Sequence, residues 1–418
     1  LATGQRLADV WPYVRNGAEV VAGYPAAMGT ADPYGWAYAA APALVALALG
    51  LAWDAGRGAR PRIRWGLLAV CVVYIAFNFK EGFVRMDEGH LGVFFANMLA
   101  LFAVLPLQPS RRPLMLGGAA AGIVAFGVLL GAHVVTRTLN PYANVKAAGD
   151  QVRTLASAAR RDALTAELRS SIAAFYAIPP QLVDRLRGHR VMFWPYDYGE
   201  IAYAHDLDMQ PLPTLESYAT YTPTLDRLGA RMLASSHAPE RILRANAPPI
   251  DERHLTFEAP LTLLEILCRY RPVTAHEPWQ VLVRTANRCG TARTLRTATA
   301  SWGESIAVPK PARPGALVLA RVENAGTQGL ERLTGLLLRP DKRWITLDGE
   351  RFRLVPATAA DGLLLHAPPR ADYPEQFALA PNPVYIAVGR DGSQPGGELR
   401  YTFVEIPIRR FPAGARAG

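Results

Sequence analysis

The sequence lacks the short motifs that would identify a common enzyme class or a nucleic-acid-binding protein. It has no Gly-x-Ser-x-Gly elbow and no His-Glu-x-x-His pair, so neither an α/β-hydrolase nor a zinc protease is indicated. No glycine-rich loop follows a candidate strand, which removes the main support for a nucleotide-binding domain. Despite a net charge of +10, no basic run alternates with aromatics. We therefore predict no nucleic-acid partner, no metal site and no assigned cofactor; a requirement for a divalent metal stays open.

A signal-peptide pattern is also absent from residues 1–33, and the first residue is Leu1 rather than Met. We therefore expect a fragment of a longer protein, whose missing N-terminal part adds further membrane spans. The basic balance of the chain favours anionic lipid headgroups or acidic glycans as partners.

Charge is nearly absent from residues 34–136 apart from short charged breaks, whereas residues 140–418 have an ordinary soluble composition. A transmembrane helix needs roughly 20 apolar residues. Four runs approach this length and are predicted to cross a membrane: Trp36–Trp53, Trp65–Phe83, Leu91–Leu107 and Leu114–Val135.

The charges between these runs predict the orientation of the spans. Arg57, Arg60, Arg62 and Arg64 lie between the first and second runs, and Arg111 and Arg112 lie between the third and fourth. Positively charged loops stay on the cytoplasmic side. We therefore predict a multi-pass protein of the cytoplasmic (inner) membrane. The N-terminal segment, the loop between runs two and three, and the large C-terminal region are all placed on the extracytoplasmic side.

Cysteine is scarce, with three in the chain. Cys71 lies inside the second run, where a thiol behaves as a small apolar residue. Cys268 and Cys289 flank a candidate helix end and strand in the region expected outside the cytoplasm, where oxidation is permitted. We predict a disulfide between Cys268 and Cys289, with two unpaired thiols as the alternative.

The loop between the second and third runs holds six ionisable residues within eleven positions. Such residues near a membrane mark either a function or the water interface. Asp87, Glu88 and His90 are the candidate catalytic residues, because an Asp–His pair can act as a general base. Lys80 and Arg85 are the candidate phosphate ligands. The alternative is an interfacial loop whose charges are solvated.

The region after the fourth run is predicted to be a long helix followed by two modules. Residues 140–177 have apolar residues at helical spacing, and Pro179-Pro180 ends that helix. Strands alternating with helices then predict an α/β unit, with strands at 190–194, 241–243 and 279–283 and helices at 225–233 and 261–270. Short runs separated by turn residues predict a β-sandwich-like domain, with strands at 316–322, 333–338, 344–347, 351–355, 384–388 and 399–403.

The predicted fold is thus a multi-domain membrane protein: an α-helical transmembrane bundle, an extracytoplasmic α/β domain and a β-sandwich-like domain. The expected divisions are an outward N-terminal segment 1–33, transmembrane helices 34–137, a stalk helix 138–180, an α/β domain 181–298 and a sandwich-like domain 299–418.

Two further groups are candidates for substrate binding. Trp194, Asp197 and Tyr198 lie at or just after the end of a predicted strand, where α/β sites form, and offer rings and a carboxylate to a sugar. Tyr218 and Tyr221 precede a helix start, with Thr222 as N-cap and Pro223 as the first helical residue. In both cases the alternative is ordinary packing of the aromatic rings.

The phrases Lys80–His90, Ser217–Asp226 and Phe352–Pro356 resemble segments of bacterial multi-pass membrane proteins of the polyprenyl-phosphate-dependent glycosyltransferase type. That resemblance implies transfer of a sugar from a lipid-phosphate donor to an envelope polysaccharide outside the cell, with membrane lipid and the lipid-linked sugar as partners. Such enzymes usually carry an acidic residue in an early outward loop, which would lie upstream of Leu1. Asp32, Asp87 and Glu88 are the nearby acids in this chain. The alternative function is a non-catalytic, membrane-anchored protein that binds glycan or a partner, or assists export.

Overall fold

The computed structural model describes residues 6–30, 34–57, 59–105, 112–131, 140–327, 338–368 and 380–409, together with a few positions between 328 and 337. The chain forms two compact units. The apolar-helix unit comprises residues 28–161 and 329–340, and the mixed unit comprises residues 1–27, 162–328 and 341–418. The α/β and β-strand regions, predicted as separate domains, thus fall in one unit, which also includes most of the N-terminal segment.

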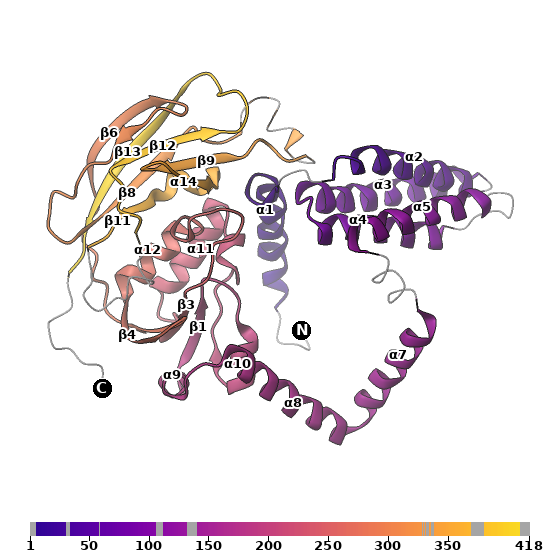
Figure 1. Ribbon diagram of the computed structural model, residues 1–418, viewed down its shortest axis with the longest axis horizontal. Helices are drawn as coiled ribbons and strands as arrows, with labels where there is room; N and C mark the ends of the chain where they lie inside the picture. Colours follow the sequence, from indigo (N-terminus) through magenta and orange to yellow (C-terminus); the bar gives the residue numbers. More distant parts are fainter. Residues whose placement is uncertain are drawn as a thin grey trace. The chain divides into compact units, whose positions relative to one another are not determined.

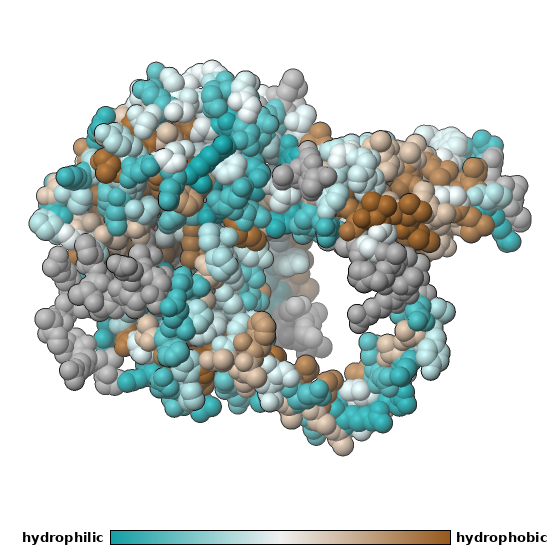
Figure 2. All heavy atoms as spheres, viewed as in Figure 1, coloured by the Kyte–Doolittle hydropathy of each residue, from teal (hydrophilic) through white to brown (hydrophobic). Residues whose placement is uncertain are grey.

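The apolar-helix unit contains four apolar helices: α2 (Ala37–Ala55), α3 (Pro61–Val84), α4 (Glu88–Val104) and α5 (Arg112–Leu130). Its core is rich in aromatic rings, with Phe83 and Phe94 packed edge to face at 5.2 Å between centroids. Figure 1 shows these helices side by side, and apolar side chains gather on their surface in Figure 2. Apolar residues are thus both inside and outside this bundle, as expected for helices in lipid.

Three of these helices, α2, α3 and α5, are long and apolar enough to cross a membrane, among the residues that the structure describes. The fourth, α4, has 17 residues and is the shorter apolar helix of the group. The four helices predicted from hydropathy therefore exist, but length and composition support three spans. The expected ends at Leu107 and Val135 lie outside the described residues, as do Arg111 and Asp32.

The predicted long helix over 140–177 is two helices, α7 (Pro141–Ala156) and α8 (Ala158–Tyr176). Asn140 caps α7 by accepting a hydrogen bond from Ala143 N. The chain leaves the helical conformation at Ser157, whose backbone is extended. Serine favours such breaks because its hydroxyl bonds to nearby backbone, and here Ser157 Oγ accepts from Arg160 N in the next helix. The helical pattern was predicted correctly, but its interruption was not.

The α/β part of the mixed unit is a five-stranded sheet in the order β2-β1-β3-β5-β4. Strand β1 pairs in parallel with β2 and β3, whereas β5 is antiparallel to β3 and β4. The strands are β1 (Arg190–Trp194), β2 (Asp208–Met209), β3 (Arg241–Ala245), β4 (Tyr270–His276) and β5 (Trp279–Arg284). The helices are α9 (Pro180–Leu186), α10 (Gly199–His205), α11 (Pro223–Ala234) and α12 (Pro260–Arg269), with short 3₁₀ turns η3 (Ser217–Ala219) and η4 (Leu255–Phe257).

Helices cover both faces of this sheet. Val191 and Phe193 of β1 pack in one core with α9 and α10. Met192 and Trp194, which alternate with them, pack in the opposite core with residues of α11 and α12. Side chains of a strand point alternately to its two faces, so the continuous apolar run 191–194 requires cover on both. The predicted α/β unit thus has three layers, with the sheet between two layers of helices (Figure 1).

The remainder of the mixed unit consists of two antiparallel four-stranded sheets, in the orders β10-β9-β12-β7 and β11-β8-β13-β6. Buried residues of both sheets form one core, including Ile345 and Val388 from the first and Val322 and Phe403 from the second. The elements are β6 (Arg293–Ser301), β7 (Ile306–Ala307), β8 (Ala316–Glu323), β9 (Arg343–Leu347), β10 (Glu350–Leu354), α14 (Pro356–Gly362), β11 (Leu363–His366), β12 (Tyr385–Arg390) and β13 (Glu398–Pro407). The shared core agrees with the predicted sandwich.

Five of the six strands predicted in this region are present. The sixth, over 333–338, is wrong at the positions that the structure describes, because 334, 335 and 338 are helix, turn and bend; 333, 336 and 337 lie outside the described residues. The prediction omitted β6, β7 and β11. Strand β6 lies at a sheet edge and is mostly exposed, so it lacks the apolar alternation that reveals a strand.

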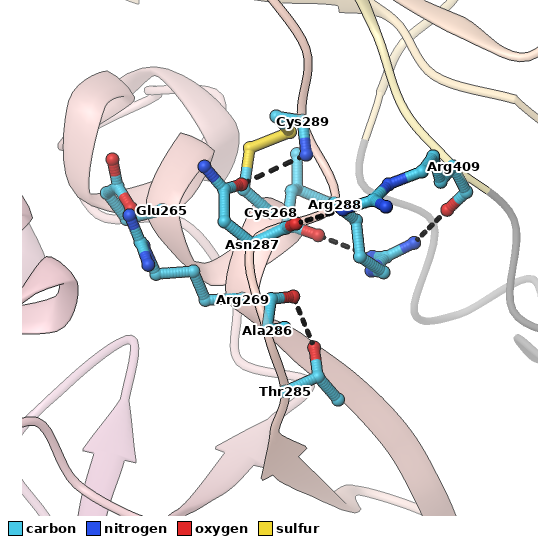
Figure 3. The surroundings of a disulfide bond; sticks show 10 residues. Glu265, Cys268, Arg269, Thr285, Ala286, Asn287, Arg288, Cys289 and Arg409 are labelled. Carbon is cyan, nitrogen blue, oxygen red and sulfur yellow. Dashed lines mark hydrogen bonds and ion pairs between the residues drawn. A yellow bond between two sulfur atoms is a disulfide. The ribbon is translucent and has the colours of Figure 1, made fainter.

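Cys268 and Cys289 form the predicted disulfide, with their Cα atoms 5.2 Å apart. Cys268 lies in the last turn of α12 and is bonded to Cys289 (Figure 3). Cys289 forms an isolated antiparallel β-bridge with Ile408, just beyond β13. The intervening Arg288 donates to Leu267 O at 2.6 Å and to Arg409 O at 2.8 Å. The crosslink therefore joins the end of α12 to the segment between β5 and β6.

Helix α1 (Val10–Met28), which follows the short turn η1 (Leu7–Asp9), packs against the mixed unit through its second half. Tyr221 Oη donates to Val20 O and Thr222 Oγ1 donates to Glu19 Oε2, each at 3.0 Å. At its C-terminal end, the buried guanidinium groups of Arg253 and Arg353 donate to Ala27 O and Ala26 O. These cations complement the negative end of the helix dipole.

Candidate functional site

The predicted charged loop is the tight turn between α3 and α4, and Asp87 organises it. Asp87 is the N-cap of α4, and its Oδ1 accepts a hydrogen bond from His90 N at 2.9 Å. The same oxygen lies 2.8 Å from His90 Nδ1. The second oxygen accepts from Arg85 Nε, also at 2.9 Å. Three of the five residues predicted here therefore form one hydrogen-bonded cluster, the Asp87 cluster (Arg85, Asp87 and His90).

The protonation of the Asp87 cluster follows from these contacts. Partial burial acts to raise the pKa of Asp87, but the hydrogen bonds from His90 and Arg85 outweigh it, and the pKa is lowered. An ionised carboxylate can only accept, so the hydrogen of this contact is carried by His90 Nδ1. About a third of the His90 side chain is exposed. The arrangement thus presents an imidazole that is oriented by a carboxylate.

Lys80 and Glu88 occupy different surroundings from the Asp87 cluster. Glu88, in the first turn of α4, is exposed and accepts a hydrogen bond from Tyr34 Oη at 2.8 Å. Lys80 lies within the last two turns of α3 and is buried, with 9% of its surface exposed. The sequence predicted Lys80 and Arg85 as a pair that binds phosphate. In the structure the Arg85 Nε–H is already committed to Asp87.

The strand-end loops of the α/β sheet converge through backbone and carboxylate contacts. Asp197 N, after β1, donates to Glu216 Oε2 at 3.1 Å, and Asp197 Oδ1 accepts from Gly199 N to begin α10. The Tyr198 ring packs edge to face on Trp279. Burial, together with nearby Glu216 and Glu200, raises the pKa of Tyr198 to about 12. Asp197 and Tyr198 are thus both partly exposed and partly engaged in packing.

Two aromatic residues predicted to bind substrate are buried instead. Trp194 is 3% exposed and lies in the core beneath α11 and α12. Tyr221 is 2% exposed, and its hydroxyl is bonded to α1. The prediction placed both rings at a surface because nothing in their local sequence reveals the helices that cover them. Tyr218 remains partly exposed, with its ring 5.6 Å from that of Tyr196.

Sequence reasoning missed a buried polar group at the same edge of the sheet. Glu258, 1% exposed, accepts a hydrogen bond from Ser217 Oγ. Arg253, equally buried, donates to Tyr218 O at 2.8 Å. Burial raises the pKa of Glu258 to about 7, although Ser217 and Arg253 oppose the shift. The polar run 251–254 after β3 was the available signal, because such loops hold functional groups.

The described residues include no group of three His, Cys, Asp or Glu side chains that is arranged to hold a metal ion. Comparison with protein-family models, with curated proteins and with solved structures gives no match. The class of protein is therefore defined by its own structure: a helical region with three candidate membrane spans, followed by a mixed α/β region with several sheets.

Proposed function

We propose that this chain is an integral membrane enzyme of the bacterial envelope that moves a sugar from a lipid-phosphate donor to an extracytoplasmic glycan. The observation that carries the proposal is the Asp87–His90 hydrogen bond of 2.8 Å at the start of α4, just after α3, a helix apolar enough to cross a membrane. A lipid-linked donor presents its phosphate at the boundary between the apolar core and water. A base at a helix end is suited to that depth.

In this mechanism, His90 Nε2 removes the proton from an acceptor hydroxyl while Asp87 stabilises the imidazolium that forms. The acceptor oxygen bonds to the anomeric carbon of the sugar, and the bond between that carbon and the phosphate oxygen breaks. The lipid phosphate leaves with the bonding electron pair. The proton on His90 is then released to water or to the leaving phosphate, which restores the neutral ring.

The two cations take different roles in this proposal. Arg85 is a positioning residue, since its Nε–H holds the second oxygen of Asp87 and so fixes the carboxylate toward His90. Lys80 supplies the positive charge for the donor phosphate, which would recover the energy of keeping an ammonium group at a buried position. Glu88, in the first turn of α4, accepts a hydrogen bond from Tyr34 Oη. In this proposal both side chains contact the acceptor glycan.

The decisive experiment compares Asp87→Asn, His90→Ala and the control Glu81→Gln in membranes supplied with synthetic polyprenyl-phosphate sugars. Asparagine caps helices as well as aspartate does, so Asp87→Asn keeps the start of α4 while removing the charge that sets the histidine tautomer. We expect release of polyprenyl phosphate to fall by about 10²–10⁴-fold in both variants, the usual contribution of a general base. Glu81, on an exposed position of α3, should tolerate its change. Full activity of both Asp87→Asn and His90→Ala at normal expression would contradict the role of this pair as the general base.

A second function is favoured by the capping geometry itself, because Asp87 would make the same contacts if it only stabilised the start of α4. The protein would then be a membrane-anchored glycan-binding protein without turnover. Tyr218 and Asp197, partly exposed at the strand ends, are its candidate binding residues. It predicts that the full chain retains envelope polysaccharide, that Tyr218→Ala weakens retention, and that Asp87→Asn leaves retention unchanged.

A further inference from the structure

Helix α7 (Pro141–Ala156) is amphipathic, and its apolar face is uncovered. None of its residues is buried in the part of the chain that the structure describes. Its large apolar side chains are among the most exposed of the protein, namely Tyr142 (78%), Val145 (74%), Val152 (64%) and Leu155 (72%). At 100° per residue these four side chains fall within an arc of about 140° on the helix. They therefore form one continuous stripe, the α7 stripe, rather than scattered exposed residues.

The rest of the α7 surface is polar, and its cations lie beside the stripe. Lys146 and Arg153 project next to Tyr142 on the helical wheel, at about 20–40° from it. Asp150 lies further round and pairs with Arg153 at 2.7 Å. Asn144 and Gln151 occupy the other border. An apolar stripe bordered by basic residues is the pattern of a helix that lies in the plane of a membrane interface.

Chain connectivity limits how far α7 can be from a bilayer. Helix α5, a candidate span, ends at Leu130, and α7 begins at Pro141. Ten intervening residues reach at most about 35 Å even when fully extended. Because α7 is tethered this closely to a candidate span, the bilayer surface is present near its apolar stripe at a high effective concentration.

We propose that the α7 stripe binds the lipid bilayer, with its apolar side chains at the boundary between headgroups and acyl chains and with Lys146 and Arg153 against anionic headgroups. The helix then lies along the membrane surface and does not rise from it as a stalk. This proposal does not depend on the transferase activity. It gives a physical reason for the break at Ser157, because an interfacial helix must turn before the chain continues into the mixed unit.

The test places a fluorescent label on each face of α7 in the full chain. Val145→Cys puts the label in the stripe. Ala147→Cys, two residues on and about 160° round the helix, puts it on the opposite, exposed face. The background is Cys71→Ala, which leaves the Cys268–Cys289 disulfide as the remaining cysteine pair. The protein is reconstituted in liposomes of zwitterionic and anionic lipid whose acyl chains carry bromine as a quencher.

We expect brominated acyl chains to quench the Val145 label severalfold more than the Ala147 label, and replacement of the anionic lipid to reduce that difference. Equal quenching of the two labels would overturn the proposal. So would a Val145 label that is shielded from water-soluble quencher but unaffected by brominated lipid, because the stripe would then pack on the mixed unit or on a second copy of the chain. Both positions are exposed, so neither substitution removes a packing contact needed for folding.

Discussion

Glu258 couples the folding of the mixed unit to pH. Its carboxyl group is 1% exposed, and burial raises its pKa from the usual 4.5 to about 7. A carboxyl group whose folded pKa is raised contributes stability that is fully present below its unfolded pKa. That contribution is lost as the pH rises through the folded pKa. Ionisation of Glu258 between about pH 4.5 and 7 therefore opposes folding.

We expect Glu258→Gln to remove this part of the pH dependence. A shift of this size corresponds to on the order of 3 kcal/mol, so the wild-type free energy of unfolding should fall toward pH 8 relative to that of the variant. Glutamine keeps an oxygen that can accept from Ser217. The measurement is denaturant unfolding of the full chain in detergent between pH 5 and 8, followed by tryptophan fluorescence. Parallel curves for the two proteins would contradict the prediction.

For individual residues, the sequence predicted chemical contacts more accurately than it predicted the burial of side chains. Asp87 and His90 are three residues apart, so their contact follows from local helical geometry and was predicted from spacing alone. Trp194 and Tyr221 were predicted to bind substrate but are buried, because α11, α12 and α1 cover them from elsewhere in the chain. Burial depends on contacts between distant segments, which spacing does not encode.

Helix α1 packs closely against the ring of Tyr221 at Gly23, where a larger residue would not fit. A Cβ atom at Gly23 would lie 2.7 Å from the Tyr221 ring, whereas one at Gly17 would meet nothing within 4 Å. Tyr221 is buried, so its ring has no free space into which it can move. The close approach of helix and ring therefore depends on the missing side chain.

We expect Gly23→Ala to weaken the docking of α1, while Gly17→Ala leaves it intact or improves it. Alanine inside a helix is favourable by about 0.5–1 kcal/mol relative to glycine, and a Cβ atom at Gly17 meets nothing, which sets the sign for the control. The readout is limited proteolysis of the α1 segment together with the thermal unfolding midpoint. If the two variants behaved alike, the contact between Gly23 and Tyr221 would not matter for stability.

Elements were predicted well where their apolar pattern was strong. The four apolar helices, the sheet strands β1, β3 and β5, and the N-cap at Thr222 are present near the predicted positions. Strands with weak patterns were missed, namely the two-residue strands β2 and β7, the four-residue β11 and the edge strands β4 and β6. Their positions are determined by hydrogen bonds to neighbouring strands rather than by local propensity.

For the whole molecule, the notable property is that the mixed unit is discontinuous in sequence. It includes residues 1–27 as well as the region after residue 162, with the apolar helices inserted between. A fragment beginning near Asn140, the natural choice from hydropathy, would lack α1. It would expose Tyr221 and leave the buried guanidinium groups of Arg253 and Arg353 without the carbonyl oxygens of Ala27 and Ala26.

We therefore expect the fragment 140–418 to unfold at a lower temperature than the mixed unit in the full chain. A synthetic peptide spanning residues 7–28 should raise its midpoint in a concentration-dependent manner, since a ligand that binds the folded state stabilises it by mass action. The same peptide with Gly23→Leu is the matched control and should have little effect. If neither peptide changed the unfolding midpoint of the fragment, α1 would be dispensable for the stability of the mixed unit.

The sequence by itself determined the apolar helices, the strands with clear patterns, the Asp87–His90 contact and the pairing expected for Cys268 and Cys289. These features depend on local composition, on short spacing or on the small number of cysteines. Only the tertiary structure decided that α1 belongs to the mixed unit, that Arg253, Arg353 and Glu258 are buried, and that Trp194 and Tyr221 are covered. The physical reason is that burial and buried charge arise from segments up to 327 residues apart, whose contact no local pattern specifies.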